Sequence, residues 1–177
     1  PQDQPTQQAS APQEQPATTT TSSKQYSAAP EMNIDLAKRY LATFKLAKGG
    51  EFVIELYPDK APITVNSFVF LAREGYYNGT TFHRVLPDFM AQGGDPTGTG
   101  SGGPGYQIPC ECYTPNHRLH FRGSLSMALS GKDTGGSQFF MVLSEQNTKH
   151  LNGVHTVFGQ ITGGLDVMKK LTDKDHM

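Results

Sequence analysis

Several features are scarce in this sequence, and each scarcity excludes a class of protein. The chain has no Trp and only two Cys, Cys110 and Cys112, so it carries no disulfide framework. Its net charge is −1 and no basic run is interleaved with aromatic residues, which argues against nucleic acid as a partner. No apolar run approaches the length of a transmembrane segment. We therefore expect a globular protein that has neither a nucleic-acid-binding surface nor a membrane-spanning segment.

Large aliphatic residues are missing from the beginning of the chain. No Val, Ile, Leu, Met or Phe occurs before Met32, and the first 30 residues are almost entirely Gln, Thr, Pro, Ser and Ala. Such a segment buries too little apolar surface to offset the entropy lost on ordering. We predict a disordered tail over residues 1–31 and a single domain over residues 32–177, which is long enough for a hydrophobic core.

The tail also bears on localisation. The chain begins with Pro rather than Met, and no charged segment followed by an apolar one precedes the tail. A polar Pro/Thr/Gln segment at this place favours a protein that is exported or associated with the cell envelope, with its signal segment removed. A cytoplasmic protein with a disordered arm is the alternative.

The start of the domain predicts a β-hairpin followed by a helix. Residues 40–47 and 51–57 alternate between apolar and polar side chains around the turn Lys48-Gly49-Gly50, with Phe52, Ile54 and Leu56 on one face. Pro62 then begins a helical pattern that stops at Gly75. The apolar face of this helix consists of Val65, Phe68, Val69 and Ala72, with Phe70 at its edge.

Short strand-like segments separated by glycine fill most of the remaining domain. They are residues 81–86, 89–94, 123–129, 137–143 and 155–161, followed by a second helix-like segment over residues 164–172. Many short strands with glycine between them favour a closed or nearly closed β-barrel, and the two helices are available to cover its open ends.

Most familiar catalytic patterns are absent. No Gly-x-Ser-x-Gly motif occurs, and the glycine run 98–106 is followed by neither Gly-Lys-Ser/Thr nor a helix, so it is no phosphate-binding loop. A metal-binding site is a stronger alternative than these catalytic motifs. Four potential ligands, Cys110, Cys112, His117 and His120, lie within eleven residues, although their spacing matches no standard zinc module.

Three long motifs carry a more specific signal. They are FHRVLPDFMAQGGDPTGTGSGGPGY, GSLSMALSGKDTGGSQFFMVL and HLNGVHTVFGQI. With them the sequence strongly resembles the cyclophilins, a class of peptidyl-prolyl cis-trans isomerase, and in particular the bacterial single-domain kind. The resemblance runs from about Tyr40 to Leu171. It implies a mainly β fold, an eight-stranded antiparallel barrel capped by two α-helices, although no final strand is visible after residue 171.

The resemblance also implies an active site. The expected catalytic residues are Arg84, Phe89, Gln92 and His155. The expected substrate-binding residues are Met90, Gly100, Ala128, Leu129, Gln138, Phe140, His150 and Leu151. A mechanism follows from their chemistry, because an X-Pro amide twisted out of plane carries a lone pair on nitrogen that the Arg84 guanidinium can bind. No cofactor is needed, and the expected substrates are unfolded or extended polypeptides that contain proline.

Two alternatives and two departures stay open at this point. The same groove could serve a proline-peptide binding module in which catalysis is incidental, and Ala28-Ala29-Pro30 could dock into the protein's own or a neighbour's active site. His150 stands where the family often has Trp, which predicts weakened binding of cyclosporin. Leu129 stands where the family usually has Asn, and since that position acts largely through its backbone, we expect little catalytic loss.

Overall fold

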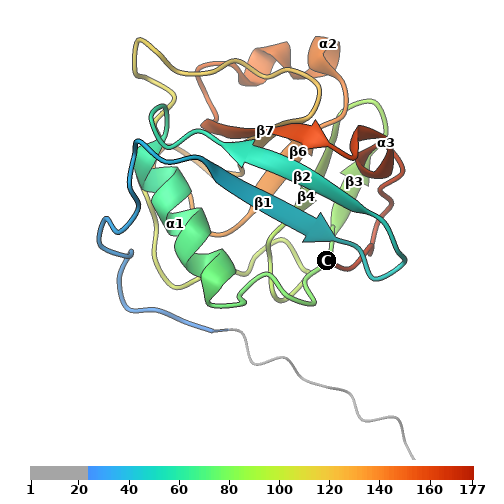
Figure 1. The fold of residues 1–177 in the computed structure, drawn as a ribbon, viewed down its shortest axis with the longest axis horizontal. Coiled ribbons are helices and arrows are strands. Elements are labelled where there is room, and N and C mark those ends of the chain that lie inside the picture. The colour runs from blue at the N-terminus through green and yellow to red at the C-terminus, as the bar shows by residue number, and fades with distance from the viewer. Residues whose placement is uncertain (1–23) are drawn as a thin grey trace, which may run out of the picture.

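The computed structural model describes residues 24–177, which form one antiparallel sheet with helices at its ends (Figure 1). The strands are β1 (Tyr40–Lys45), β2 (Glu51–Leu56), β3 (Arg84–Leu86), β4 (Met90–Gly93), β5 (Ser124–Met127), β6 (Phe139–Val142) and β7 (Val157–Gly163). Their order across the sheet is β1-β2-β7-β5-β6-β4-β3. The expected mainly β, barrel-like fold is thereby confirmed. Seven strands lie in the described part of the chain, and β1 and β3 form the edges of a sheet that does not close.

Within the described residues, three short or medium helices accompany the sheet. They are α1 (Pro62–Arg73), α2 (Glu145–Thr148) and α3 (Leu165–Met168), and the 3-10 turn Lys149–Leu151 follows α2 directly. The helices α1 and α3 correspond to the two that the sequence predicted, whereas α2 was missed because a single turn shows no periodicity. In residues 24–177 no helix is both long enough and apolar enough to cross a membrane.

The β1–β2 hairpin follows the predicted pattern. Its turn requires left-handed backbone at Gly49 and Gly50, with φ of +93° and +92°, which glycine adopts without a steric penalty. Within β2, Phe52, Ile54 and Leu56 are buried while the residues between them are more exposed. The alternation therefore places one face of this hairpin on the core.

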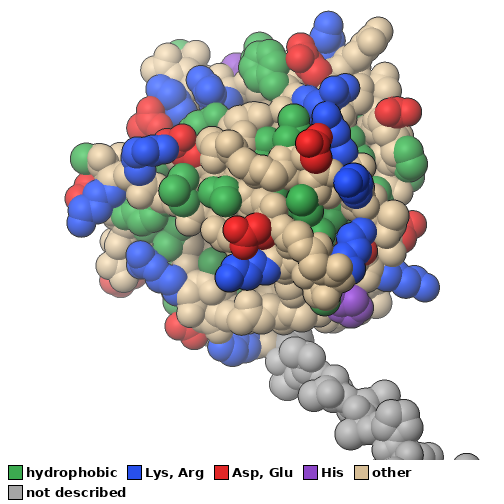
Figure 2. All heavy atoms as spheres, turned by 45° about the vertical axis from the view of Figure 1, so that its right-hand side comes forward, with side chains coloured by type: hydrophobic (Ala, Val, Ile, Leu, Met, Phe, Trp, Pro, Cys, Tyr) green, Lys and Arg blue, Asp and Glu red, His purple; other side chains and the backbone are tan. Residues whose placement is uncertain are grey.

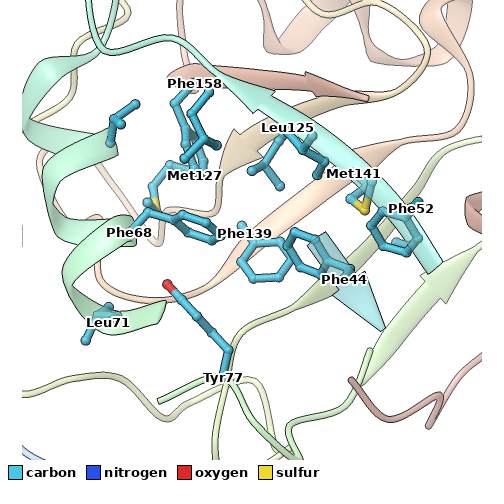
Figure 3. Close-up of a cluster of buried hydrophobic side chains, with 14 of the residues drawn as sticks. Phe44, Phe52, Phe68, Leu71, Tyr77, Leu125, Met127, Phe139, Met141 and Phe158 are labelled. Atoms are coloured by element: carbon cyan, nitrogen blue, oxygen red, sulfur yellow. The ribbon is translucent and has the colours of Figure 1, made fainter. Parts of the chain in front are cut away.

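The core lies between the sheet and α1, and aromatic rings dominate it (Figure 3). Phe139 of β6 is at its centre, with T-shaped contacts to Phe44 at 5.6 Å and to Phe68 of α1 at 5.9 Å between ring centroids. Tyr77 closes the cluster from the loop after α1, at 5.7 Å from the Phe139 ring. Edge-to-face pairs of this kind add to the stabilisation from burial itself.

Helix α1 is buried more deeply than its predicted apolar face. Leu71 is fully buried, whereas Ala72, which the sequence placed on the buried face, is exposed. The start of the helix has no cap from its own segment. Instead the Glu111 carboxylate accepts hydrogen bonds from the backbone N–H groups of Ile63 and Thr64, at 3.0 and 2.9 Å. A carboxylate at this end stabilises the helix through its unpaired N–H groups and its dipole.

The segment that precedes β1 runs beside α1 (Figure 1). Residues 1–23 of the predicted disordered tail lie outside the described residues, but residues 24–31 of that tail are placed against the domain. The Asn66 side chain of α1 donates hydrogen bonds to the carbonyls of Pro30 and Glu31, at 3.3 and 3.0 Å. Ala29-Pro30 therefore lies beside α1 and not in the protein's own active site, contrary to one prediction, because Asn66 holds this backbone.

Charged side chains are interspersed on the surface. On the face shown in Figure 2, Lys and Arg side chains alternate with Asp and Glu side chains, and hydrophobic side chains lie between them. This distribution agrees with the net charge of −1.

Candidate active site

The β3–β4 hairpin carries the proposed catalytic arginine. Arg84 and Gln92 are directly opposite each other in the antiparallel register, so their side chains are neighbours. The hairpin turns through Asp88, whose φ of +58° is a left-handed conformation that Asp tolerates better than most residues. Among residues 24–177, no group accepts a hydrogen bond from the exposed Arg84 guanidinium, whose N–H donors are thus available to a ligand.

A small apolar cluster, called here the apolar pocket because the sequence analysis expects it to hold the proline ring, lies next to this arginine in the strand register. Met90, Phe140 and Val142 form a buried cluster separate from the main core. Phe89, Ala128 and Leu151 pack against it while remaining partly exposed. The register explains the grouping, since β4 and β6 place Met90 opposite Val142 and Gln92 opposite Phe140. The structure brings the predicted apolar residues together and adds Val142, which the sequence analysis had not singled out.

His155 stands beside the Phe140 ring. The two rings are 5.4 Å apart and nearly perpendicular. The Nδ1 atom of His155 lies 2.9 Å from the carbonyl oxygen of Met127, and because a carbonyl only accepts, Nδ1 carries the proton. The hydrogen bond orients the ring and leaves Nε2 for a ligand.

His120, one of the four candidate metal ligands, packs against the pocket. Its ring stacks on Phe140 at 5.7 Å with an angle of 6° between the planes. Its Nδ1 and Nε2 lie 2.8 Å from Asn152 Oδ1 and 2.9 Å from Ser126 Oγ. Burial lowers the pKa of His120, although the hydrogen bond to Asn152 acts in the opposite direction. A neutral, fully hydrogen-bonded imidazole here is a packing element.

Each of the other three candidate metal ligands also has its own hydrogen-bond partner. Cys112 donates its thiol proton to the Val154 carbonyl at 3.3 Å, and Cys110 Sγ accepts a hydrogen bond from the Asp133 N–H at 3.2 Å. His117 Nδ1 lies 2.8 Å from its neighbouring Thr114 carbonyl. In the described part of the chain, no three His, Cys, Asp or Glu side chains form a group that could hold a metal ion. The proposed cluster is not assembled.

A groove of about 820 Å³ lies beside the apolar pocket. Among its lining residues are Gln92, Gly100, Ala128, Leu129 and Gln138. The Gln92 amide donates to Gln138 Oε1 at 2.9 Å, and the Gln138 amide donates to the carbonyls of Gly100 and Gly102, both at 2.9 Å. Gln92 therefore links the arginine, the pocket and the glycine loop.

Asp95 holds that loop in place, a role that the sequence analysis missed. The carboxylate is fully buried and accepts hydrogen bonds from the N–H groups of Thr97, Gly100 and Gly102. Burial raises the pKa of Asp95, but these hydrogen bonds outweigh it and the pKa lies below its ordinary value. The fit requires glycine at 102, since a Cβ there would stand 2.0 Å from Asp95 Oδ1. An Asp before a Pro-Thr-Gly turn was the available signal.

The backbone of Ala128 and Leu129 is only partly free. The Ala128 N–H donates to the Gln138 carbonyl at 3.0 Å, so it is not available to a substrate. In residues 24–177 the Ala128 carbonyl and both backbone groups of Leu129 have no such partner. An extended peptide could pair with these groups as an added strand.

Comparisons with known proteins agree with this geometry. Residues 41–176 match the family model described as cyclophilin type peptidyl-prolyl cis-trans isomerase/CLD. The chain belongs to this family. It is 56% identical to peptidyl-prolyl cis-trans isomerase B of Bacillus subtilis over 134 residues, which cover 76% of this chain and 92% of that protein. A Helicobacter pylori peptidyl-prolyl cis-trans isomerase is 52% identical over 144 residues, covering 80% of this chain and 85% of the relative.

Solved cyclophilin structures are similar in fold. A Cryptosporidium parvum cyclophilin-type isomerase, crystallised in the presence of the dipeptide Ala-Pro, is 34% identical with a TM-score of 0.67. The match covers 78% of this chain and 90% of that one. The chain is thus an enzyme of the peptidyl-prolyl isomerase class. In the present chain, the exposed His150 ring stacks on the Phe89 ring, with 5.9 Å between ring centroids and 11° between the ring planes.

Proposed function

We propose that this cyclophilin isomerises X-Pro bonds in unfolded or extended chains, with Arg84 as the electrostatic catalyst. The observation that carries the proposal is an exposed guanidinium, without a hydrogen-bond acceptor among residues 24–177, placed opposite Gln92 and beside a small apolar cluster. A proline ring fits the pocket, and the amide nitrogen of that proline then lies near the arginine. No covalent intermediate or cofactor is required.

The physical basis is selective binding of the twisted amide. Resonance makes the planar C–N bond partly double, and uncatalysed exchange of an X-Pro bond takes tens to hundreds of seconds. Twisting the bond removes resonance and localises a lone pair on nitrogen. The Arg84 guanidinium, always protonated, donates to that lone pair and so favours the transition state over both planar isomers.

The neighbouring groups hold the substrate while its carbonyl side rotates. Phe89, Met90, Phe140 and Leu151 grip the ring by apolar contact, and His155 stands at the rim. Gln92, opposite Arg84 in the strand register, offers its amide to a substrate carbonyl. The free backbone groups of Leu129 bind the peptide in an extended form. The segment Ala128-Leu129, directly after β5, thereby fixes the part of the substrate that must not rotate.

The test is the isomerisation rate of a short Ala-Pro-Phe peptide. We expect Arg84→Ala to lower kcat/KM about 100- to 1,000-fold, and Arg84→Lys to recover only part of the loss because ammonium lacks the planar fork. The matched control is Arg39→Ala, since Arg39 is an exposed arginine paired with Glu55 at 2.8 Å, outside the site. Equal rates for the intact chain and Arg84→Ala would contradict the mechanism.

The same measurements separate an enzyme from a binding module. A module that only holds proline peptides would bind the Ala-Pro-Phe peptide without accelerating its isomerisation. Assistance to folding is then tested with a protein whose refolding is limited by a slow prolyl phase. We expect the intact chain to accelerate that phase and Arg84→Ala to leave it slow.

We propose further that the protein is exported or associated with the cell envelope. The support is the composition of residues 1–23, in which Gln, Thr, Pro, Ser and Ala predominate. Fractionation of cells that express the full gene product tests this proposal. Recovery of the protein with cytoplasmic markers alone would contradict it.

A further inference from the structure

The segment 24–26, called here the N-terminal arm, lies before the first residue that the family model matches, yet the domain holds it in place. The Tyr26 N–H donates to the Pro104 carbonyl at 2.8 Å. One residue earlier, the Gln25 side-chain amide donates to the Gly103 carbonyl at 2.7 Å. The arm is thus bound to the glycine-rich loop that forms one side of the groove beside the active site.

Aromatic contacts anchor the arm. The Tyr26 ring meets Phe70 of α1 edge to face, with 5.0 Å between ring centroids. Tyr76 and Tyr106 lie on two further sides of the ring, each at 6.4 Å. A Tyr among three aromatic rings has a large contact area with few rotatable bonds, so it holds the neighbouring residue at little entropic cost.

The loop is shaped to receive the arm. Gly105 has a φ of +93°, and a Cβ at this position would lie 2.6 Å from the Tyr26 carbonyl oxygen and 3.0 Å from Gln25 Oε1. Any larger residue would therefore collide with the arm as well as strain the backbone. The domain leaves a space at Gly105 that the arm fills.

Gln25 reaches from this anchor to the wall of the groove. It lines the same 820 Å³ groove as Gln92 and Gln138. It is also connected to them through the loop, since Gly103 accepts from Gln25 while the preceding Gly102 carbonyl accepts from Gln138 at 2.9 Å. Among residues 24–177, none of those that line this groove is charged.

We propose that Gln25 is a specificity-determining residue that selects the substrate side chain entering this groove. The inference rests on the proposed isomerase function. In an extended peptide, alternate side chains point to the same face. The side chain two positions from the proline therefore faces the groove when the proline fills the apolar pocket. An uncharged wall of amides favours a neutral hydrogen-bonding side chain such as Gln over Glu, whose charge would lose hydration without a partner.

The experiment compares isomerisation of two peptide series by exchange NMR. One is Z-Ala-Pro-Phe-Ala and the other Ala-Ala-Pro-Phe-Z, where Z is Ala, Gln or Glu, so that both same-face positions are covered. We expect the intact chain to prefer Gln over Glu about threefold to tenfold in one series. In Gln25→Ala the preference should fall below about twofold, through KM more than kcat, because the contact is remote from the amide.

Two further variants distinguish a groove contact from a general effect. Gln146→Ala removes the same amide from an exposed position on α2, and we expect the preference to remain unchanged. Gly105→Ala should displace the whole arm and abolish the preference as Gln25→Ala does. Thermal unfolding of Gln25→Ala should match that of the intact chain, which a purely structural role of Gln25 would not allow.

Three outcomes would overturn the inference in different ways. A Gln preference that persists in Gln25→Ala removes Gln25 from specificity. Catalysis by the intact chain with no preference at either position shows that the groove does not select, while the proposed function stands. Absence of catalysis on every peptide contradicts the proposed function itself, and this inference with it.

Discussion

The apolar pocket and the adjoining groove are built in opposite ways. The pocket walls come from β4 and β6, and strand register places Met90, Phe140 and Val142 together. The groove walls come from loops, in which the buried carboxylate of Asp95 and the amide of Gln138 hold the backbone. One region is shaped by close packing and the other by hydrogen bonds.

The difference matches what we propose that each region binds. Every substrate brings the same proline ring, and a rigid apolar pocket needs only the right shape to hold it. The flanking side chains vary, and a polar groove discriminates among them through hydrogen bonds that are lost when the wrong group enters. Substitutions that affect one region should therefore leave a different signature from those that affect the other.

The largest effect is expected in the pocket. Phe140→Ala removes a ring that is 4% exposed and on which both His120 and His155 pack. We expect a loss of about 3–5 kcal/mol in the free energy of unfolding, measured in urea, and a loss of activity on all X-Pro peptides alike. Phe121→Ala is the control, because its 48% exposed ring should contribute less than about 1 kcal/mol.

The groove should be disrupted by Asp95→Asn. The amide replaces one charged acceptor oxygen with a donor that faces the N–H groups of the loop. We expect a loss of about 2–3 kcal/mol in unfolding free energy and a rise in KM that exceeds the fall in kcat. Asp166→Asn, with a side chain 89% exposed, should change neither. Retention of full stability in Asp95→Asn would show that the loop does not depend on this carboxylate.

A substitution at the rim of the pocket should sharpen the comparison. The family often has Trp where this chain has His150, whose ring stacks on Phe89. We expect His150→Trp to strengthen cyclosporin inhibition about tenfold by adding apolar contact area, with a smaller change in peptide turnover. An inhibition titration measures this. Nanomolar inhibition of the unmodified chain would contradict the expectation that cyclosporin binds weakly.

The smallest expected effect is the pH dependence of the unfolding free energy, in which the pocket and the groove should differ. The folded-state pKa of His120 is lowered mainly by burial, so the unfolded chain binds a proton first and stability falls as pH drops below about 6.5. The pKa of Asp95 is also lowered, but its contribution is present above about pH 3.9 and is lost only below it. As the pH falls, the stabilisation that depends on His120 in the pocket should therefore be lost at a higher pH than the stabilisation that depends on Asp95 in the groove.

Urea unfolding at pH 7.5, 5.5 and 4.5 measures this difference. We expect His120→Asn to reduce the loss of stability between pH 7.5 and 5.5. Part of the loss should remain, because burial also lowers the pKa of His83. His176→Asn, at an exposed position, should keep the whole loss. A pH dependence that is identical in all three proteins would exclude His120 as its source.

The outline of the fold and most of the pocket could be predicted. Alternation identified β1 and β2, the helical period identified α1, and the motifs pointed to Arg84 and its apolar neighbours. The roles of Asp95 and His120 lie outside these patterns, although the Asp-Pro-Thr-Gly turn was a local signal for Asp95. Both depend on partners brought near by folding, such as the Gly102 N–H and the Phe140 ring. The single-turn helix α2 left no periodic signal at all.

The sequence by itself determined the fold class and the family and predicted a catalytic role for Arg84, because periodicity and long ordered motifs are local properties of the chain. Tertiary structure alone decided which polar groups are already in use. It engaged the Ala128 N–H, left Cys110, Cys112, His117 and His120 without a shared metal site among residues 24–177, and placed Gln25 of the arm on the groove. Hydrogen-bond partners that are distant in sequence meet only when the sheet forms, so no local pattern reveals them.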